Sequence, residues 1–183
     1  MLDLTFRRRM LPTNTALSLV LRVATGLLLA QICQAEEFNL TSRLKVDIAD
    51  KEFTIQPMPE AGLSEPTLCL REKGEFLTLA VSVQEPFPGT LDDYKTAFVA
   101  AMPSQGATMI SMEHRSQFPA PSGLEMKSYK ARTKVDGEMN TQLIFFTRLA
   151  GEVHLTIFSF PVEKECDSTA PRVDAIMKTA KLR

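Results

Sequence analysis

Several stretches of the chain alternate between apolar and polar residues, a period of two that is typical of β-strands with one buried face. In residues 44–48, leucine, valine and isoleucine alternate with lysine and aspartate. Residues 52–55 are expected to form a hairpin with this first strand, and residues 57–66, which hold three prolines, an irregular loop. The pattern predicts strands at 44–48, 52–55, 67–72, 75–84, 107–117, 124–134, 139–149 and 153–160.

Two of these strands carry no charge over their central residues. One is the stretch from Phe76 to Val83, and the other contains the continuous apolar run Ile144-Phe145-Phe146. A strand without charge on either face is typical of the interior of a sheet that is covered on both sides. We therefore expect other elements to pack on both faces of this sheet.

Two further stretches repeat their apolar residues at intervals of three or four, which predicts amphipathic helices. The first covers residues 91–102, and Thr90 and Asp93 are placed to form its capping box. The second begins near Ser168 or Thr169. The apolar positions are Leu91, Tyr94, Phe98 and Met102 in the first helix, and Val173, Ile176, Met177 and Ala180 in the second.

The order of these elements is strands, a helix, more strands and a last helix. Asp136-Gly137 and Gly151 supply the turns that antiparallel hairpins need. The sequence therefore predicts an α+β domain, with a mostly antiparallel sheet of about six strands and helices packed on its faces.

This order of elements, together with several local sequences, resembles the PsbP-like fold, an α/β/α sandwich. The sequences are Thr90-Leu91-Asp92-Asp93-Tyr94, Gly123-Leu124, Asp136-Gly137, and Val153 through Phe158-Ser159-Phe160-Pro161. The resemblance covers residues 42–182 and is to a family that includes an extrinsic photosystem subunit, a small Ran-binding protein and DcrB-type bacterial envelope proteins. It implies protein binding or assistance to an assembly, and it offers no catalytic motif.

The first 35 residues have the three parts of a secretory signal. Residues 23–33 form an apolar core, and Cys33-Gln34-Ala35 ends it with small residues. The apolar core is too short to span a bilayer, which needs roughly 20 residues. The positive flank is formed by Arg7, Arg8, Arg9 and Arg22. We expect cleavage after Ala35, export to the periplasm, and a single domain over residues 36–183.

Cleavage changes the charge balance of the chain. The remaining 148 residues hold 17 basic and 21 acidic side chains, which gives a net charge of −4. A mildly acidic surface repels a phosphate backbone, so nucleic acid is not an expected partner. We expect no cofactor and no stable membrane span after cleavage.

Cys69 and Cys166 are the two cysteines that remain after cleavage. In an oxidising compartment such a pair is expected to form a disulfide. In the chain-entropy model, a loop of this length would stabilise the fold by about 4–5 kcal/mol. The alternative is two buried free thiols, because cysteine is often buried.

Candidate chemistry is sparse, because His114 and His154 are the only histidines. The sequence has no Gly-x-Ser-x-Gly motif, so a hydrolase is the least favoured class, and no catalytic residue is assigned. Met109, Met112 and His114 are soft ligands of the kind that copper prefers. Strict alternation, however, puts Met109 on the opposite face from the other two. We therefore interpret the methionines as core residues and assign no metal site.

The dipeptide Phe-Pro occurs three times, each time at the end of a predicted strand: Phe87-Pro88, Phe118-Pro119 and Phe160-Pro161. The simplest interpretation is that the ring closes the edge of the core and proline ends the strand. The functional alternative is that Phe87 and Phe118 lie on loops and form an apolar patch that binds a partner.

These observations favour an exported, non-catalytic protein-binding module. Its partner would be a secreted effector, if the chain is an immunity or inhibitor protein, or a component of an envelope complex, if it is an accessory factor. The alternative is a periplasmic carrier of a small molecule or of copper, which requires a deep pocket between sheet and helix.

Overall fold

Most of the predicted elements are present in the computed structural model, which describes residues 36–49, 53–58, 63–72, 75–135, 137–162 and 169–183. The helices are α2 (Leu91–Ala101), the 3-10 helix η3 (Met102–Gln105) and α3 (Thr169–Met177). The strands are β1 (Glu36–Asn39), β2 (Leu44–Ile48), β3 (Phe53–Met58), β4 (Leu63–Glu72), β5 (Glu75–Pro86), β6 (Ala107–His114), β7 (Glu125–Val135), β8 (Glu138–Leu149), β9 (Glu152–Pro161) and β10 (Lys181–Leu182).

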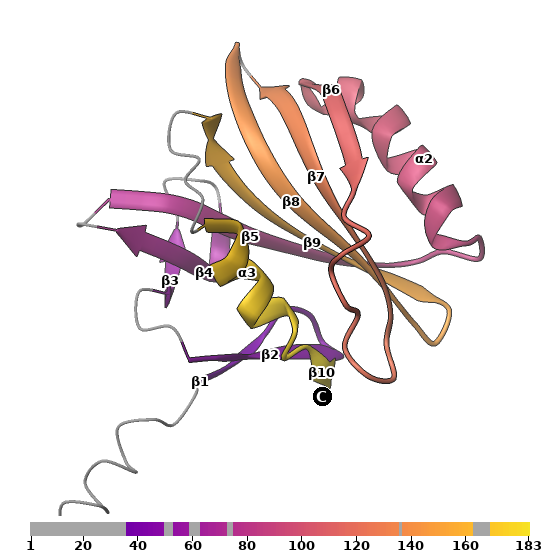
Figure 1. Ribbon diagram of the computed structural model, residues 1–183. Helices are drawn as coiled ribbons and strands as arrows, with labels where there is room; N and C mark the ends of the chain where they lie inside the picture. Colours follow the sequence, from indigo (N-terminus) through magenta and orange to yellow (C-terminus); the bar gives the residue numbers. More distant parts are fainter. Residues whose placement is uncertain (1–35, 50–52, 59–62, 73–74, 136, 163–168) are drawn as a thin grey trace, which may run out of the picture. The chain divides into compact units, whose positions relative to one another are not determined.

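The described strands form two antiparallel sheets (Figure 1). The larger sheet has seven strands in the order β3-β4-β5-β9-β8-β7-β6, and the smaller has three in the order β1-β2-β10. Figure 1 shows α2 beside β6 and β7, whereas α3 runs towards β2 and β10. This arrangement confirms the predicted α+β class, with a sheet one strand larger than the six expected.

Two expectations about the beginning of the domain are wrong. The strand at 44–48 does not form a hairpin with residues 52–55, because β2 pairs with β1 and β10 while β3 pairs with β4. Residues 57–66 are not one irregular loop, because β3 runs to Met58 and β4 starts at Leu63. Pro57 is tolerated because β3 is an edge strand and its register shifts at this residue.

Strand β6 differs from its prediction in length and in regularity. It ends at His114 rather than at residue 117, and its register with β7 shifts between Met109 and Ser111. The extra residue reverses the alternation, so Met109 and Met112 lie opposite Thr133 and Ala131, on the same face of the sheet. The expectation that Met109 points away from Met112 is therefore wrong.

The centre of β8 is covered on both faces, as its uncharged sequence predicted. Ile144, Phe145 and Phe146 each have 0% exposure, and consecutive residues point to opposite faces. Phe145 belongs to the α3-side core, whose buried members are Leu40, Leu44, Val46, Ile48, Phe53, Leu143, Phe145, Phe158, Phe160, Val173, Ile176, Met177 and Ala180. Ile144 and Phe146 belong to the α2-side core, which consists of Leu91, Tyr94, Tyr129, Ala131, Ile144, Phe146, Val153 and Leu155.

The other uncharged strand, β5, is less completely covered than expected. It lies inside the seven-stranded sheet, between β4 and β9. Val83, however, is 45% exposed near its end. The absence of charge therefore correctly indicated that β5 lies inside the sheet. The expectation that other elements cover both of its faces fails near the end of the strand, at Val83.

The start of α2 confirms the predicted capping box. The Thr90 hydroxyl accepts a hydrogen bond from the Asp93 amide, and the Asp93 carboxylate accepts one from the Thr90 amide. The two hydrogen bonds from Thr90 lower the pKa of Asp93. This local signal fixes where α2 begins and hence which of its residues face the sheet.

Candidate functional site

A groove lies between the segment that follows β6 and the last turns of α3. Residues 114–119 form one side of it, and Asp174 of α3 and Lys178, the residue that follows this helix, form the other. Its volume is about 400 Å³, which is within the usual size range of ligand sites.

An ion pair between Arg115 and Asp174 holds the two sides of the groove together. Arg115 donates hydrogen bonds to both carboxylate oxygens of Asp174, at 2.8 and 2.5 Å, and to the Ser128 hydroxyl at 3.0 Å. The two ion-pair side chains are only 19% and 18% exposed. A two-point contact between a planar guanidinium and a carboxylate fixes orientation as well as distance, so the groove is formed before any ligand arrives.

The remaining side chains of the groove are less constrained. Ser116, Gln117 and Lys178 are exposed. The His114 ring is also exposed and tilts against Tyr129, with ring centroids 5.3 Å apart. These exposed side chains form the rim of the groove and can supply hydrogen bonds and one positive charge to a bound surface. Arg115, by contrast, holds the two sides of the groove together.

Phe118, one of the two predicted partner-binding residues, lines this groove. Its half-buried ring packs edge-on against Phe145 at 5.2 Å and lies 5.8 Å below the Arg115 guanidinium. Phe87 packs instead against Tyr94 of the α2-side core, at 5.1 Å. The two rings thus contact different cores. Such contacts are expected if each ring closes the edge of a core at the end of a strand. Binding of a partner by Phe87 and Phe118 stays a prediction.

A second group of polar residues surrounds His154, whose side chain has 0% exposure. Its Nδ1 lies 2.7 Å from the Thr41 hydroxyl, and its Nε2 lies 3.9 Å from the Glu152 carboxylate. Hydroxyl, imidazole and carboxylate are the groups of a hydrolytic triad, but a triad needs an accessible nucleophile and a hydrogen-bonded carboxylate. The Thr41 oxygen is occupied by two backbone amides, and 3.9 Å is beyond hydrogen-bond reach. This geometry does not activate Thr41.

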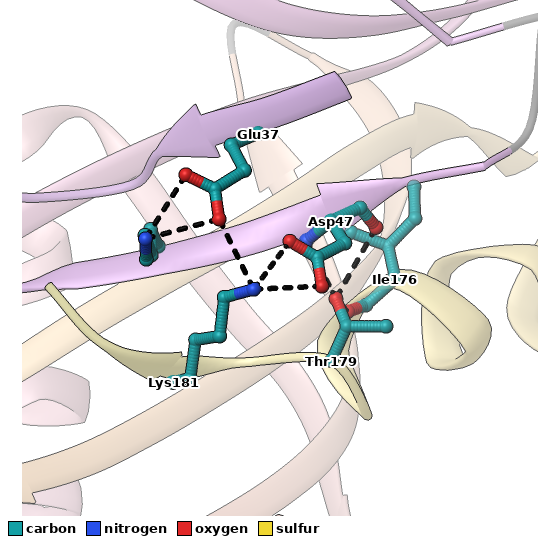
Figure 2. A network of polar contacts seen from close by, with 6 residues as sticks. Glu37, Asp47, Ile176, Thr179 and Lys181 are labelled. Atoms are coloured by element: carbon teal, nitrogen blue, oxygen red, sulfur yellow. Dashed lines mark hydrogen bonds and ion pairs between the residues drawn. The ribbon is translucent and has the colours of Figure 1, made fainter. Parts of the chain in front are cut away.

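The C-terminal segment is fixed on β2 by a third polar group (Figure 2). Thr179 accepts a hydrogen bond from the Asp47 amide at 2.7 Å, and Lys181 contacts the Glu37 and Asp47 carboxylates at 3.1 and 2.8 Å. Hydrogen bonds from Lys45 and Lys181 lower the pKa of Glu37. Because β10 directly follows α3, these contacts help to set the position of the groove's second side.

Other residues singled out in the sequence do not join these groups. Met109 and Met112 are half-buried and pack against the α2-side core. Among the described residues, no three His, Cys, Asp or Glu side chains cluster in a way that could hold a metal ion.

Cys166 and the side chain of Cys69 lie outside the described residues, as does the export signal at 1–35, so the disulfide and the signal stay predictions. Within the described part of the chain, no helix is long and apolar enough to cross a membrane.

No pattern in the sequence indicates the ion pair that shapes the groove. Arg115 and Asp174 are 59 residues apart, and nothing near either residue marks it as half of a pair. In the sequence His154 stands out only as one of two histidines, and its contact with Thr41 joins residues 113 positions apart. Because the predicted strand at 107–117 includes Arg115, the sequence pattern did not show that this residue follows β6.

Comparison with known proteins identifies the fold. No protein-family model matches the sequence, and curated proteins give no match. Among solved structures, the chain is similar to the cyanobacterial PsbP (CyanoP) of Synechocystis sp. PCC 6803, with a TM-score of 0.54 and 14% identity. The match covers 82% of this chain and 94% of that one. The chain therefore has a PsbP-like fold, as its resemblance predicted, and at this identity the likeness shows the fold alone.

Two further structures are more distant. LpqN of Mycobacterium tuberculosis, which is involved in cell envelope biogenesis, has a TM-score of 0.48 and 10% identity over 81% of this chain and 90% of that one. A Pseudomonas aeruginosa protein of unknown function has a TM-score of 0.48 and 12% identity over 80% and 95%. Similarity of this extent supports no argument about this chain.

Proposed function

We propose that residues 36–183 form an exported, non-catalytic protein-binding module, and that the partner binds at the groove between residues 114–119 and α3. The observation that carries this proposal is the fixed geometry of the groove. The Arg115–Asp174 pair holds both sides in place, so a partner binds without paying the entropy of ordering a loop.

The chemistry of the groove favours binding over catalysis. Its best-placed charged groups, Arg115 and Asp174, are bound to each other and to Ser128. The surface left to a partner consists of exposed polar side chains around part of an aromatic ring, Phe118. An apolar centre with a polar rim is the usual composition of a protein interface.

The compartment follows from the N-terminal pattern of the sequence. A positive flank, a short apolar core and small residues before Glu36 support removal of residues 1–35 during export to the periplasm. In that compartment the partner would be either a secreted effector or a component of an envelope complex. N-terminal mass spectrometry of the exported chain tests this step, and a protein that still begins at Met1 would contradict it.

The groove is tested by blocking it without touching the core. Residues 36–183 serve as bait for envelope proteins, and the captured partner is then titrated against three forms of the bait. Ser116→Arg fills the groove from an exposed position, and Lys178→Glu reverses its positive charge. Ala97→Arg is the matched control, because Ala97 is an exposed residue of α2 and does not line the groove.

We expect Ser116→Arg to weaken binding at least tenfold, because the longer side chain would occupy the groove that the partner fills. Lys178→Glu should weaken binding less, and Ala97→Arg should leave it unchanged. All three variants should keep the melting temperature of the parent chain. Equal affinity of the parent and Ser116→Arg would show that the partner does not bind at this groove.

A further inference from the structure

The turn that joins β1 to β2 is attached to the seven-stranded sheet by three consecutive side chains. These contacts, which we call the turn contacts, are Thr41 to His154 at 2.7 Å, Ser42 to Gln84 at 2.7 Å and Arg43 to Glu152 at 3.6 Å. A hydrogen bond of 3.0 Å from Gln84 to Glu152 links the second contact to the third. None of these residues lines the groove proposed to bind a partner.

The hydrogen bonds of Thr41 determine where His154 carries its hydrogen. The Thr41 oxygen accepts from the backbone amides of Leu44, at 3.1 Å, and Arg43, at 3.3 Å. A hydroxyl has two acceptor sites and one hydrogen, so both acceptor sites are occupied and the hydroxyl hydrogen is donated to Nδ1. The neutral imidazole therefore carries its own hydrogen on Nε2.

The surroundings of His154 offer little compensation for a positive charge. Its opposite neighbours on β5 and β8, Gln84 and Thr147, are uncharged. The charged groups that face it are Glu152 on its own strand and Arg43 from the turn. Nε2 has no hydrogen-bond partner among the described residues. Burial lowers the pKa of His154, Arg43 adds to this effect, and Glu152 opposes it.

A second proton on His154 is incompatible with the attached turn. It binds at Nδ1 and converts this atom from an acceptor into a donor. The Thr41 oxygen would then face three donors with two acceptor sites, and its own hydrogen would lose its acceptor. The ring can regain its hydrogen bonds in water if the turn moves away.

We propose that protonation of His154 detaches residues 40–43 from the seven-stranded sheet, so that this turn opens in mild acid. The detached turn uncovers Leu40, which is 6% exposed in the attached form. The open form binds a proton that the attached form excludes. The ratio of open to attached molecules therefore rises as pH falls below about 6.5, by at most tenfold per pH unit.

The test measures amide hydrogen exchange between about pH 7 and pH 5, where histidines titrate and ordinary carboxyl groups stay ionised. The Leu44 amide, which donates to Thr41, reports the turn, and the Phe145 amide in β8 reports global unfolding. After correction for the intrinsic exchange rate, protection of Leu44 should fall by several-fold to tenfold per pH unit while that of Phe145 changes less. Equal loss at both amides, or no loss at Leu44, would overturn the proposal.

The two histidines of the chain provide a matched pair of variants. His154→Gln should abolish the pH dependence at Leu44, whereas His114→Gln, at an exposed position, should retain it. Nitrogen chemical shifts of the wild-type imidazoles decide the matter even if His154→Gln does not fold. We expect His154 to carry its hydrogen on Nε2 at pH 7.5 and to titrate below about pH 6.5, the ordinary midpoint of histidine. A hydrogen on Nδ1, or a titration midpoint of His154 above that value, would contradict the proposal.

Discussion

The two cores of this domain are built from different parts of the chain. The α2-side core draws its buried residues from the continuous stretch between Leu91 and Leu155. The α3-side core combines buried residues of β8 and β9 with residues from both ends of the described chain, from Leu40 to Ala180, and covers the opposite face of the same strands. One face is thus closed by a neighbouring helix, and the other by segments that meet only when the chain ends come together.

The contacts that hold the two sides differ accordingly. On the α2 side, Tyr94 and Phe98 pack edge-on against Phe146, with ring centroids 5.4 and 5.7 Å apart. Burial, and a hydrogen bond to the Glu85 carboxylate, raise the pKa of Tyr94. On the α3 side, polar contacts join distant residues, such as Arg115 to Asp174 and Asp47 to Thr179. Directional bonds between distant segments form and break together, so we expect the α3 side to open before the α2 side.

The largest effects are expected from two adjacent phenylalanines that serve opposite cores. Phe145→Ala and Phe146→Ala each remove a ring with 0% exposure, and each should lower the free energy of unfolding by about 3–5 kcal/mol. The cavities lie on different sides of β8. Phe145→Ala should therefore speed amide exchange in α3 and β2, and Phe146→Ala in α2. Denaturant unfolding and hydrogen exchange measure both effects, and identical exchange patterns would show that the two cores behave as one.

The strand positions could be predicted because they depend on local pattern. The alternation in Leu44–Ile48 and the uncharged centre of β8 each located a strand within a residue or two. What alternation cannot specify is the partner of a strand, since it fixes only which residues share a face. The pairing of β2 with β10 joins residues more than 130 positions apart, and the bulge in β6 depends on its fit to β7.

The next largest effect should come from the ion pair that frames the groove. Arg115→Met leaves the Asp174 carboxylate and the buried Ser128 hydroxyl without this partner. We expect a loss of about 2–3 kcal/mol, less than for a fully buried pair, because both side chains are partly exposed.

Adding Asp174→Leu to Arg115→Met tests whether the loss comes from the unpaired charge. The double variant should recover part of the stability, as measured in a double-mutant cycle. The groove should lose its shape in both variants, so partner binding should not recover with stability. If Arg115→Met unfolds at the parent's denaturant concentration, the pair does not support the α3 side.

The candidate site was less predictable than the fold for a physical reason. A groove forms where a loop and a helix meet, and the residues that fix it, Arg115 and Asp174, are ordinary surface types in sequence. Phe118 was recognised because proline follows it, a local signal. No comparable signal marks Thr41 as the hydrogen-bond partner of a buried histidine.

A smaller effect is expected at the C-terminal attachment shown in Figure 2. Thr179→Val keeps the shape of the side chain but removes the acceptor of the Asp47 amide. A buried amide without a partner costs free energy, and because this site is only half-buried we expect about 1–2 kcal/mol. Thr179→Ser is the matched control and should retain most of the stability. Exchange of the Asp47 amide should rise in the valine variant alone, and a rise in both would assign the effect to packing.

The smallest effect should come from the α2 side, at the polar contact that caps the helix and is local in sequence. Thr90→Val removes the hydroxyl that caps the Asp93 amide, whereas Thr90→Ser retains it. Loss of an N-cap typically costs about 1 kcal/mol. Because the rings of Tyr94 and Phe98 still hold the helix on Phe146, only the first turn of α2 should fray, and exchange beyond that turn should stay unchanged. If Thr90→Val instead speeds amide exchange along all of α2, the attachment of this helix also depends on a hydrogen bond. The two cores would then not differ in the way proposed, with apolar contacts on the α2 side and polar contacts on the α3 side.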